Sequence, residues 1–211
     1  MLIRRVMAAL IGLVTLSGAD IALGEARERI KVEGDAIVYD GGVEVLDESV
    51  PADADVLRQL LSPEKAIRRI ILTGQFDKTT SALDVARVID DFDLDTEIRD
   101  ECTDGCLYMF VAGEKRLLQK GAKLGVRRRM VSAEYVKDHF EERKARYGWE
   151  DEFGQAAMLY DVGQSDMRWA LLYLMDHGVS VGFALRVFAT PREDMWWPER
   201  DELVEAAVIK D

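Results

Sequence analysis

Residues 94–113 read LDTEIRDECTDGCLYMFVAG, and they join a strand pattern to an apolar run at the two cysteines of the chain. Leu94, Thr96 and Ile98 alternate with charged residues, which is the period of a half-buried strand. The apolar run that follows is bounded by Gly105 and Gly113. The turn at 102–106 therefore lies at the carboxyl end of a strand where a helix begins. In open α/β sheets, ligands and catalytic side chains gather at such ends.

Strand and helix patterns alternate on both sides of this turn. Residues 67–74 (IRRIILTG) and 122–126 (AKLGV) predict strands, while 53–64 and 79–93 carry apolar residues at helical spacing. The helix at 53–64 opens on Asp53 or Asp55 as its expected cap. Strands separated by helices imply an α/β fold with a largely parallel sheet and right-handed crossovers.

The second half of the chain is predicted to be helical. Helices are expected at 132–148 with Ser132 as cap, at 164–178 with Ser165 as cap, and at 180–191 with Ser180 as cap. The end of the chain reads as a loop, a short helix from Pro198 and a final strand. These caps explain the serines structurally and leave them without an expected catalytic role.

The N-terminus has the layout of a secretory signal peptide. Arg4 and Arg5 precede an uncharged run at 6–19, and small residues follow up to Gly24. That run is short for a bilayer span of about 20 residues. We therefore expect residues 1–24 to be a signal peptide, 25–211 to be a single domain without a stable membrane span, and the mature protein to be periplasmic or secreted.

The charge of the chain limits its partners. A formal net charge of -12 over 211 residues argues against nucleic acid as a partner. The charge is uneven, since 84–101 is dominated by carboxylates and 114–129 is basic. Either both segments are solvated faces, or the basic one forms a groove for an anionic ligand or a partner's tail.

Taken together, the segments 67–74, 95–126 and 189–209 resemble the periplasmic relatives of the Clp protease proteolytic subunit, in the Clp/crotonase superfamily. The most specific features are the Cys102-x-x-x-Cys106 turn, the following Ala112-Gly113, and Leu124-Gly125. The resemblance covers about residues 36–209. It implies a Clp/crotonase-like fold of stacked β-β-α units, and self-association as trimers or as rings of six or seven.

The resemblance also implies a serine nucleophile, a histidine base, an acid that orients it, and backbone amides that hold an oxyanion. Asp104 stands in the serine's place and Arg127 in the histidine's, while Gly74 and Gln75 occupy the oxyanion glycine pair. An ionised aspartate and an arginine cannot perform the same proton transfers. The orienting acid is not fixed: Thr190 aligns loosely, and Asp194 is the nearest carboxylate.

This pattern predicts a degenerate site in which Asp104 and Arg127 form an ion pair. A competing hypothesis keeps Asp104 as a working carboxylate in a rebuilt site of a peptidase-like or other acyl hydrolase. Some crotonase relatives use acids on acyl thioesters, although coenzyme A thioesters are not expected outside the cytoplasm.

The cysteines allow several interpretations. Their spacing is one residue too long for the usual redox pair, and the sequence offers no second pair for a zinc site. A disulfide between Cys102 and Cys106 suits an oxidising compartment. Buried free thiols and redox or metal roles remain the alternatives.

The sequence thus favours an exported, non-catalytic binding or scaffold protein, with no cofactor and no metal. Its partner would be an unknown protein or peptide, or a second copy of the chain. Trp196 and Trp197 cannot both face inward on a regular element, so one is expected in the core and one at a rim or a partner surface.

Overall fold

The computed structural model describes residues 29–43, 52–61, 66–77, 79–128 and 132–210. The predicted signal peptide lies outside these residues, so its status stays a prediction. Among the described helices, none is both long enough and apolar enough to cross a membrane.

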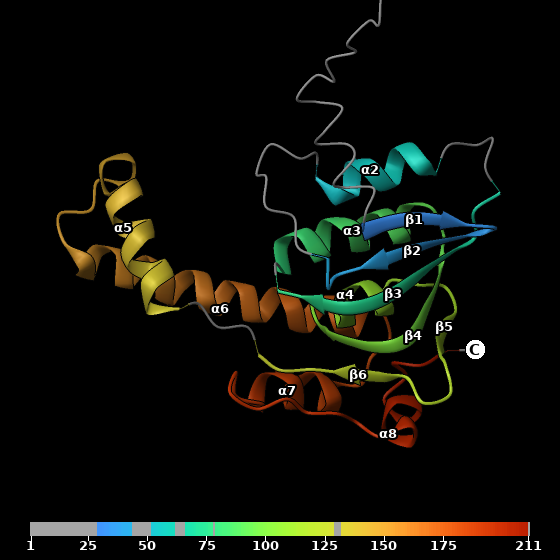
Figure 1. Ribbon diagram of the computed structural model, residues 1–211. Helices are drawn as coiled ribbons and strands as arrows, with labels where there is room; N and C mark the ends of the chain where they lie inside the picture. Colours follow the sequence, from blue (N-terminus) through green and yellow to red (C-terminus); the bar gives the residue numbers. More distant parts are fainter. Residues whose placement is uncertain (1–28, 44–51, 62–65, 78, 129–131, 211) are drawn as a thin grey trace, which may run out of the picture.

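A six-stranded sheet organises the described chain (Figure 1). Its main path runs β1-β2-β3-β4-β5, and β6 pairs with β4 beyond the end of β5. Only the β1–β2 pairing is antiparallel; the others are parallel. The strands are β1 (Ile30–Glu33), β2 (Ala36–Asp40), β3 (Arg69–Phe76), β4 (Asp95–Asp104), β5 (Arg116–Leu118) and β6 (Lys123–Gly125).

The alternation of side chains along these strands gives the sheet two different faces. Tyr39, Leu72 and Ile98 lie in one row across β2, β3 and β4, and all are buried in the core. Helices α2 (Asp53–Leu60), α3 (Thr79–Asp91) and α4 (Cys106–Val111) contribute to the same core. The opposite row places Ile71 beside Glu97, so a carboxylate lies on the second face.

The second half is helical, as predicted, with α5 (Ala133–Tyr147), α6 (Glu152–Asp176), α7 (Val181–Ala189) and α8 (Arg200–Glu205). Figure 1 shows α5 and the first half of α6 extending away from the sheet, with α7 and α8 beside β6. The architecture is therefore mixed α/β with a largely parallel sheet and a helical C-terminal half.

Three local predictions are wrong. Ser165 lies inside α6, which begins after Asp151, whose carboxylate accepts hydrogen bonds from the backbone amides of the first turn. Asp53 is not a cap, because it is buried and its carboxylate accepts from Arg29 and Tyr39. The expected final strand is reduced to an isolated bridge between Lys210 and Arg116. By contrast, Ser132 and Ser180 cap α5 and α7 as expected.

Candidate functional site

The turn between β4 and α4 is sharp. Asp104 ends β4 with a φ of 60°, in the left-handed region that residues other than glycine rarely adopt. The next residue must be small, because a Cβ on Gly105 would lie 2.6 Å from the Cβ of Ala82. Strained strand-to-helix turns of this kind present nucleophiles in hydrolases, and the geometry is present here with an aspartate at its apex.

The predicted disulfide is present across this turn. Cys102 at the end of β4 and Cys106 at the start of α4 are bonded, with their Cα atoms 5.8 Å apart, and both are fully buried. The structure describes no free cysteine. The bond joins the strand to the helix on either side of Asp104, and so it restricts the turn.

Asp104 and Arg127 form the ion pair that the sequence predicted. The Arg127 Nε donates to Asp104 Oδ1 at 2.7 Å, and a terminal nitrogen donates to Oδ2 at 3.0 Å. The pair is only partly exposed, at 23% for the Arg127 side chain and 15% for that of Asp104. The remaining terminal nitrogen of Arg127 donates to the backbone carbonyl of Arg192 at 2.9 Å. The hydrogen bond to Asp104 raises the pKa of Arg127, and burial only partly opposes it.

Gln75, one of the two predicted oxyanion positions, lies in the same cluster. Its side-chain amide donates to Asp104 Oδ2 at 3.1 Å and to Asp77 Oδ1 at 2.8 Å. Both oxygens of Asp104 are therefore engaged by donors from Arg127 and Gln75. Two residues thus hold the carboxylate through three hydrogen bonds.

The backbone around Gly74 differs from an open oxyanion hole. Gly74 has a φ of 85°, and a Cβ there would lie 2.5 Å from the backbone nitrogen of Gly42. Beyond it β3 continues to Phe76, whose carbonyl accepts from the amide of Gly105 at 3.0 Å. In strand-to-helix sites the amide after the nucleophile is one of the oxyanion donors. Here that amide is already bonded to a protein carbonyl.

Neither candidate position for the acid that would orient the base contributes a carboxylate to this cluster. The hydroxyl of Thr190 donates to the Arg186 carbonyl at 3.0 Å, and Asp194 is exposed. Trp196 is half-buried beside Phe183, whereas Trp197 is 38% exposed, so the tryptophan pair divides as expected. No group of three or more potential ligand side chains capable of holding a metal is found within the described ranges.

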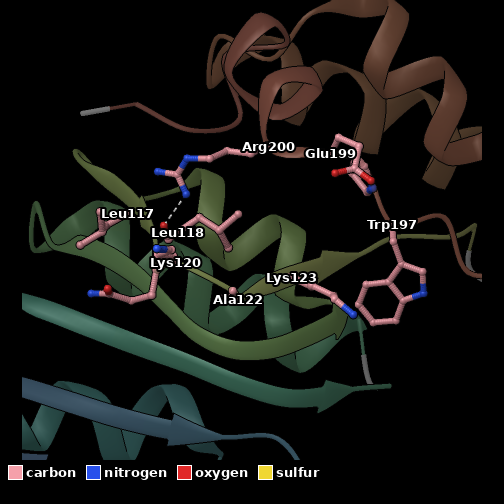
Figure 2. Close-up of a pocket in the computed structure, with 11 residues that line it drawn as sticks. Leu117, Leu118, Lys120, Ala122, Lys123, Trp197, Glu199 and Arg200 are labelled. Carbon is pink, nitrogen blue, oxygen red and sulfur yellow. Dashed lines mark hydrogen bonds between the residues drawn. The ribbon is translucent and has the colours of Figure 1, made fainter.

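Apart from the Asp104 cluster, a cavity lies at the connection between β5 and β6 (Figure 2). This connection belongs to the basic segment 114–129, for which the sequence allowed a groove as one of two alternatives. The cavity has a volume of about 680 Å³, and residues 117–123 and 197–200 line it. Lys120 and Lys123 of the basic segment belong to its lining, but Arg127 does not. The basic segment is thus divided between two places.

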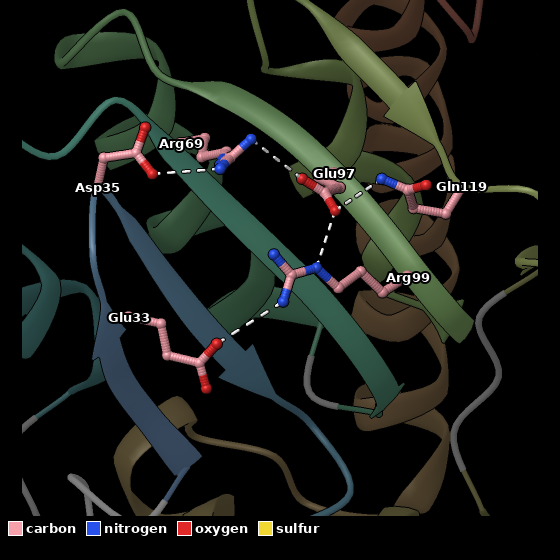
Figure 3. A network of polar contacts seen from close by, with 6 residues as sticks. All are labelled: Glu33, Asp35, Arg69, Glu97, Arg99 and Gln119. Carbon is pink, nitrogen blue, oxygen red and sulfur yellow. Dashed lines mark hydrogen bonds and ion pairs between the residues drawn. The ribbon is translucent and has the colours of Figure 1, made fainter.

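Sequence reasoning also missed a buried acid. Glu97 is 3% exposed on the second face of the sheet, where Arg99 donates to it at 2.8 Å and Gln119 at 3.0 Å. Burial raises the pKa of Glu97, but these hydrogen bonds and the charges of Arg99 and Arg69 outweigh it and lower the pKa. Figure 3 shows the network, which continues from Arg69 to Asp35 and from Arg99 to Glu33. The other members come from β1, the β1–β2 turn, β3, β4 and the loop after β5, and of these only Arg99 is a close neighbour of Glu97 in the sequence, so a local pattern does not predict most of the network.

No protein-family model matches this sequence, and no curated protein matches it. Among solved structures, one assigned as an enoyl-CoA hydratase from Streptomyces coelicolor A3(2) is 13% identical with a TM-score of 0.45, over 96% of this chain and 70% of that one. One assigned as an enoyl-CoA hydratase/isomerase from Mycobacterium abscessus is 10% identical with a TM-score of 0.47, over 86% and 67%. These similarities concern the fold, and no site residue or activity is transferred from them.

Proposed function

We propose that this chain is an exported, non-catalytic protein of the Clp/crotonase-like type that acts as a binding or scaffold module in the cell envelope. The observation that carries the proposal is the bidentate pair of Asp104 and Arg127. It occupies the two positions where the family resemblance would place a nucleophile and its base.

The chemistry of the Asp104–Arg127 pair supports the proposal that the protein does not catalyse acyl transfer. Arg127 is a donor whose pKa is raised further by Asp104, so it cannot accept a proton near neutral pH. The oxygens of Asp104 accept three hydrogen bonds from Arg127 and Gln75, and its side chain is only 15% exposed. The residues in the places of the nucleophile and the base, and the amide of Gly105 that would stabilise an oxyanion, are therefore each hydrogen-bonded within the protein.

The disulfide between Cys102 and Cys106 supports the exported part of the proposal. Disulfides persist in oxidising compartments and are rare in a reducing cytosol. This fits the signal-peptide pattern at 1–24 and a periplasmic or secreted location. Fractionation of expressing cells, with mass measurement of the mature N-terminus, tests it: an uncleaved chain confined to the cytoplasm would refute export.

The test of non-catalysis compares wild type with Asp104→Ala on peptide and ester substrates, together with a serine-directed phosphonate probe. We expect no turnover above buffer and no labelling for either protein. Asp84→Ala is the matched control, because Asp84 forms an exposed pair with Arg87 away from the turn. Turnover that disappears in Asp104→Ala but persists in the control would establish a rebuilt hydrolase site and overturn the proposal.

Helix α6 supports the self-association part of the scaffold role. Of its 25 residues only Gln155, Ala170 and Leu174 are buried. Phe153 is 81% exposed and Tyr160 is 70% exposed, although both are large and apolar. Such exposed apolar surface on a soluble protein is typical of an interaction site.

The spacing of this exposed face is self-complementary. In an antiparallel pair of α6 helices centred on residue 158, Phe153 lies opposite Gly163, and Ala156 lies opposite Tyr160. Each ring then faces a small residue of the other copy, and every contact occurs twice, as an isologous two-fold contact requires. We expect light scattering to give a multiple of the 23.8 kDa chain mass, less any signal peptide, and Tyr160→Glu to give the monomer. A monomeric wild type at tens of micromolar would refute this contact.

A further inference from the structure

The cavity beside β5 and β6 has a preformed shape. Two segments make its walls, the β5–β6 connection and the chain from Trp197 to Arg200 (Figure 2). A terminal nitrogen of Arg200 donates to the backbone carbonyl of Leu118 at 2.7 Å, and so it ties one wall to the other. Its volume of about 680 Å³ lies within the range of about 300–1,000 Å³ for ligand sites.

Trp197 is held in place although it is partly exposed. The backbone of its neighbour Trp196 is bonded to Val126 in both directions, at 2.9 and 3.0 Å. The ring of Trp197 packs on the backbone of Gly125, where a Cβ would lie 2.8 Å from the ring. The indole therefore forms a fixed apolar wall of the cavity, and Leu117 and Ala122 add to it.

The charge of the lining is opposite to that of the whole chain. The lining contains three cations and one carboxylate, that of Glu199; the cations are Lys120, Lys123 and Arg200. That carboxylate is engaged in the capping box of α8 with Glu202. The Lys123 amine lies 5.8 Å from the centre of the Trp197 ring, and its contact with Glu101 at 3.6 Å is exposed on both sides. On a chain of net charge -12, this is a local concentration of cations beside an aromatic ring.

We propose that this cavity binds the carboxyl terminus of a peptide whose last residue is apolar or aromatic. The carboxylate would lie beside the amine of Lys120 and the free donors of the Arg200 guanidinium at one end of the cavity, and the last side chain would lie toward Trp197 and Lys123 at the other end (Figure 2). A peptide is favoured over a small anion because the cavity, at about 680 Å³, is larger than a carboxylate needs, and its lining continues from the cations to the apolar side chains of Leu117, Ala122 and Trp197. The backbone carbonyl of Leu118 is occupied by Arg200 and is not offered to the ligand.

This inference rests on the proposed binding function and names the class of partner. It does not depend on the site at Asp104, so the two fail separately. Turnover in the hydrolase assay would overturn the non-catalytic role and leave this cavity untouched. Failure to bind peptides, without turnover, would overturn this inference alone.

The experiment is titration calorimetry with the protein purified after expression of the full 211-residue sequence. The probes are N-acetyl-Gly-Ala-Ala-Phe with a free carboxylate, the same peptide as its amide, and 3-phenylpropionate. We expect the acid peptide to bind at least about tenfold more tightly than the amide, because the amide lacks the charged carboxylate and loses the hydrogen bonds to it. We also expect its affinity to fall as salt rises.

Variants locate the site. Lys120→Gln and Trp197→Ala should each weaken binding of the acid peptide by roughly threefold to tenfold, since each removes one direct contact with it, and Lys123→Gln should weaken binding by a smaller factor through the loss of a nearby positive charge. Lys31→Gln, an exposed lysine on β1, should leave it unchanged. Arg200→Lys keeps the charge while losing the planar fork, and it should weaken binding without loss of folding. Equal binding of acid and amide, equal binding of 3-phenylpropionate and the acid peptide, or undiminished affinity in the lysine variants would each overturn the assignment.

Discussion

Arg116 provides the sharpest test of how the helical half is attached to the sheet. Its side chain is 3% exposed and donates to the backbone carbonyls of Gly113 at 3.0 Å, His177 at 2.9 Å and Ala207 at 3.1 Å. These carbonyls lie after α4, after α6 and after α8. Burial lowers the pKa of Arg116, but an arginine remains protonated at neutral pH.

Truncation by Arg116→Ala would remove three hydrogen bonds from a charged donor and leave three carbonyls without it. At about 1.5 kcal/mol or more for each bond, with losses that are not additive, we expect the free energy of unfolding to fall by roughly 3–5 kcal/mol. This is a large part of the 5–15 kcal/mol that is typical of a domain. Arg116→Lys should lose less, because an ammonium keeps the charge but cannot reach all three acceptors.

The assay is urea unfolding followed by circular dichroism at neutral pH. Arg87→Ala serves as the control, since Arg87 forms an exposed pair with Asp84 and should change stability by less than about 1 kcal/mol. If Arg116→Ala does not fold, Arg116→Lys still gives a measurable loss. A loss of less than about 1 kcal/mol in Arg116→Ala would refute the role assigned to this side chain.

Three further predictions follow from other buried positions. Because the pKa of Glu97 is lowered in the folded chain, its stabilisation is complete above the ordinary glutamate pKa of about 4.3 and is lost as pH falls through the lowered value. Urea unfolding from pH 7 to pH 2 should show a shallower acid loss in Glu97→Gln than in wild type, and identical slopes would contradict this. Cys102→Ala with Cys106→Ala opens a short loop and should cost about 2 kcal/mol, while unchanged stability would show that the bond constrains nothing. Gly113→Ala would place a Cβ 2.8 Å from the backbone nitrogen of Thr96, so calorimetry should show a lower melting temperature, with a cost of about 1–3 kcal/mol.

The parts of the fold that follow from local patterns could be predicted. The alternation of Leu94, Thr96 and Ile98 gave β4, and the position of the two cysteines at its end gave the turn and the disulfide. The ion pair of Asp104 with Arg127 was accessible through the resemblance, because it depends on two aligned positions and not on periodicity.

The failures come from contacts that are distant in sequence. Asp53 precedes a helix and has the chemistry of a cap, but Arg29 and Tyr39 satisfy its buried carboxylate instead. Glu97 lies in an alternating strand where a charged residue indicates solvent, yet its neighbours across the sheet bury it. The sequence predicts a helix from residue 164, but α6 begins at Glu152. The first half of α6 projects from the sheet and carries apolar side chains such as Phe153 on an exposed face. It therefore lacks the buried apolar stripe by which a helix is usually predicted.

The basic segment shows why a run of like charges does not specify a single surface. Along the described part of this segment, 114–128, the chain forms β5, a turn and β6, and the strand alternation directs successive side chains to different sides. Arg116 turns inward to three carbonyls, Lys120 and Lys123 line the cavity, and Arg127 reaches Asp104. The expected alternatives of a solvated face or a basic groove therefore each describe only part of it. Arg127, which pairs with Asp104, and Lys120 and Lys123, which line the proposed peptide site, all belong to this short segment. Replacing one of these cations by glutamine in either place changes the net charge equally, so the effects on the turn and on the cavity can be compared at the same net charge.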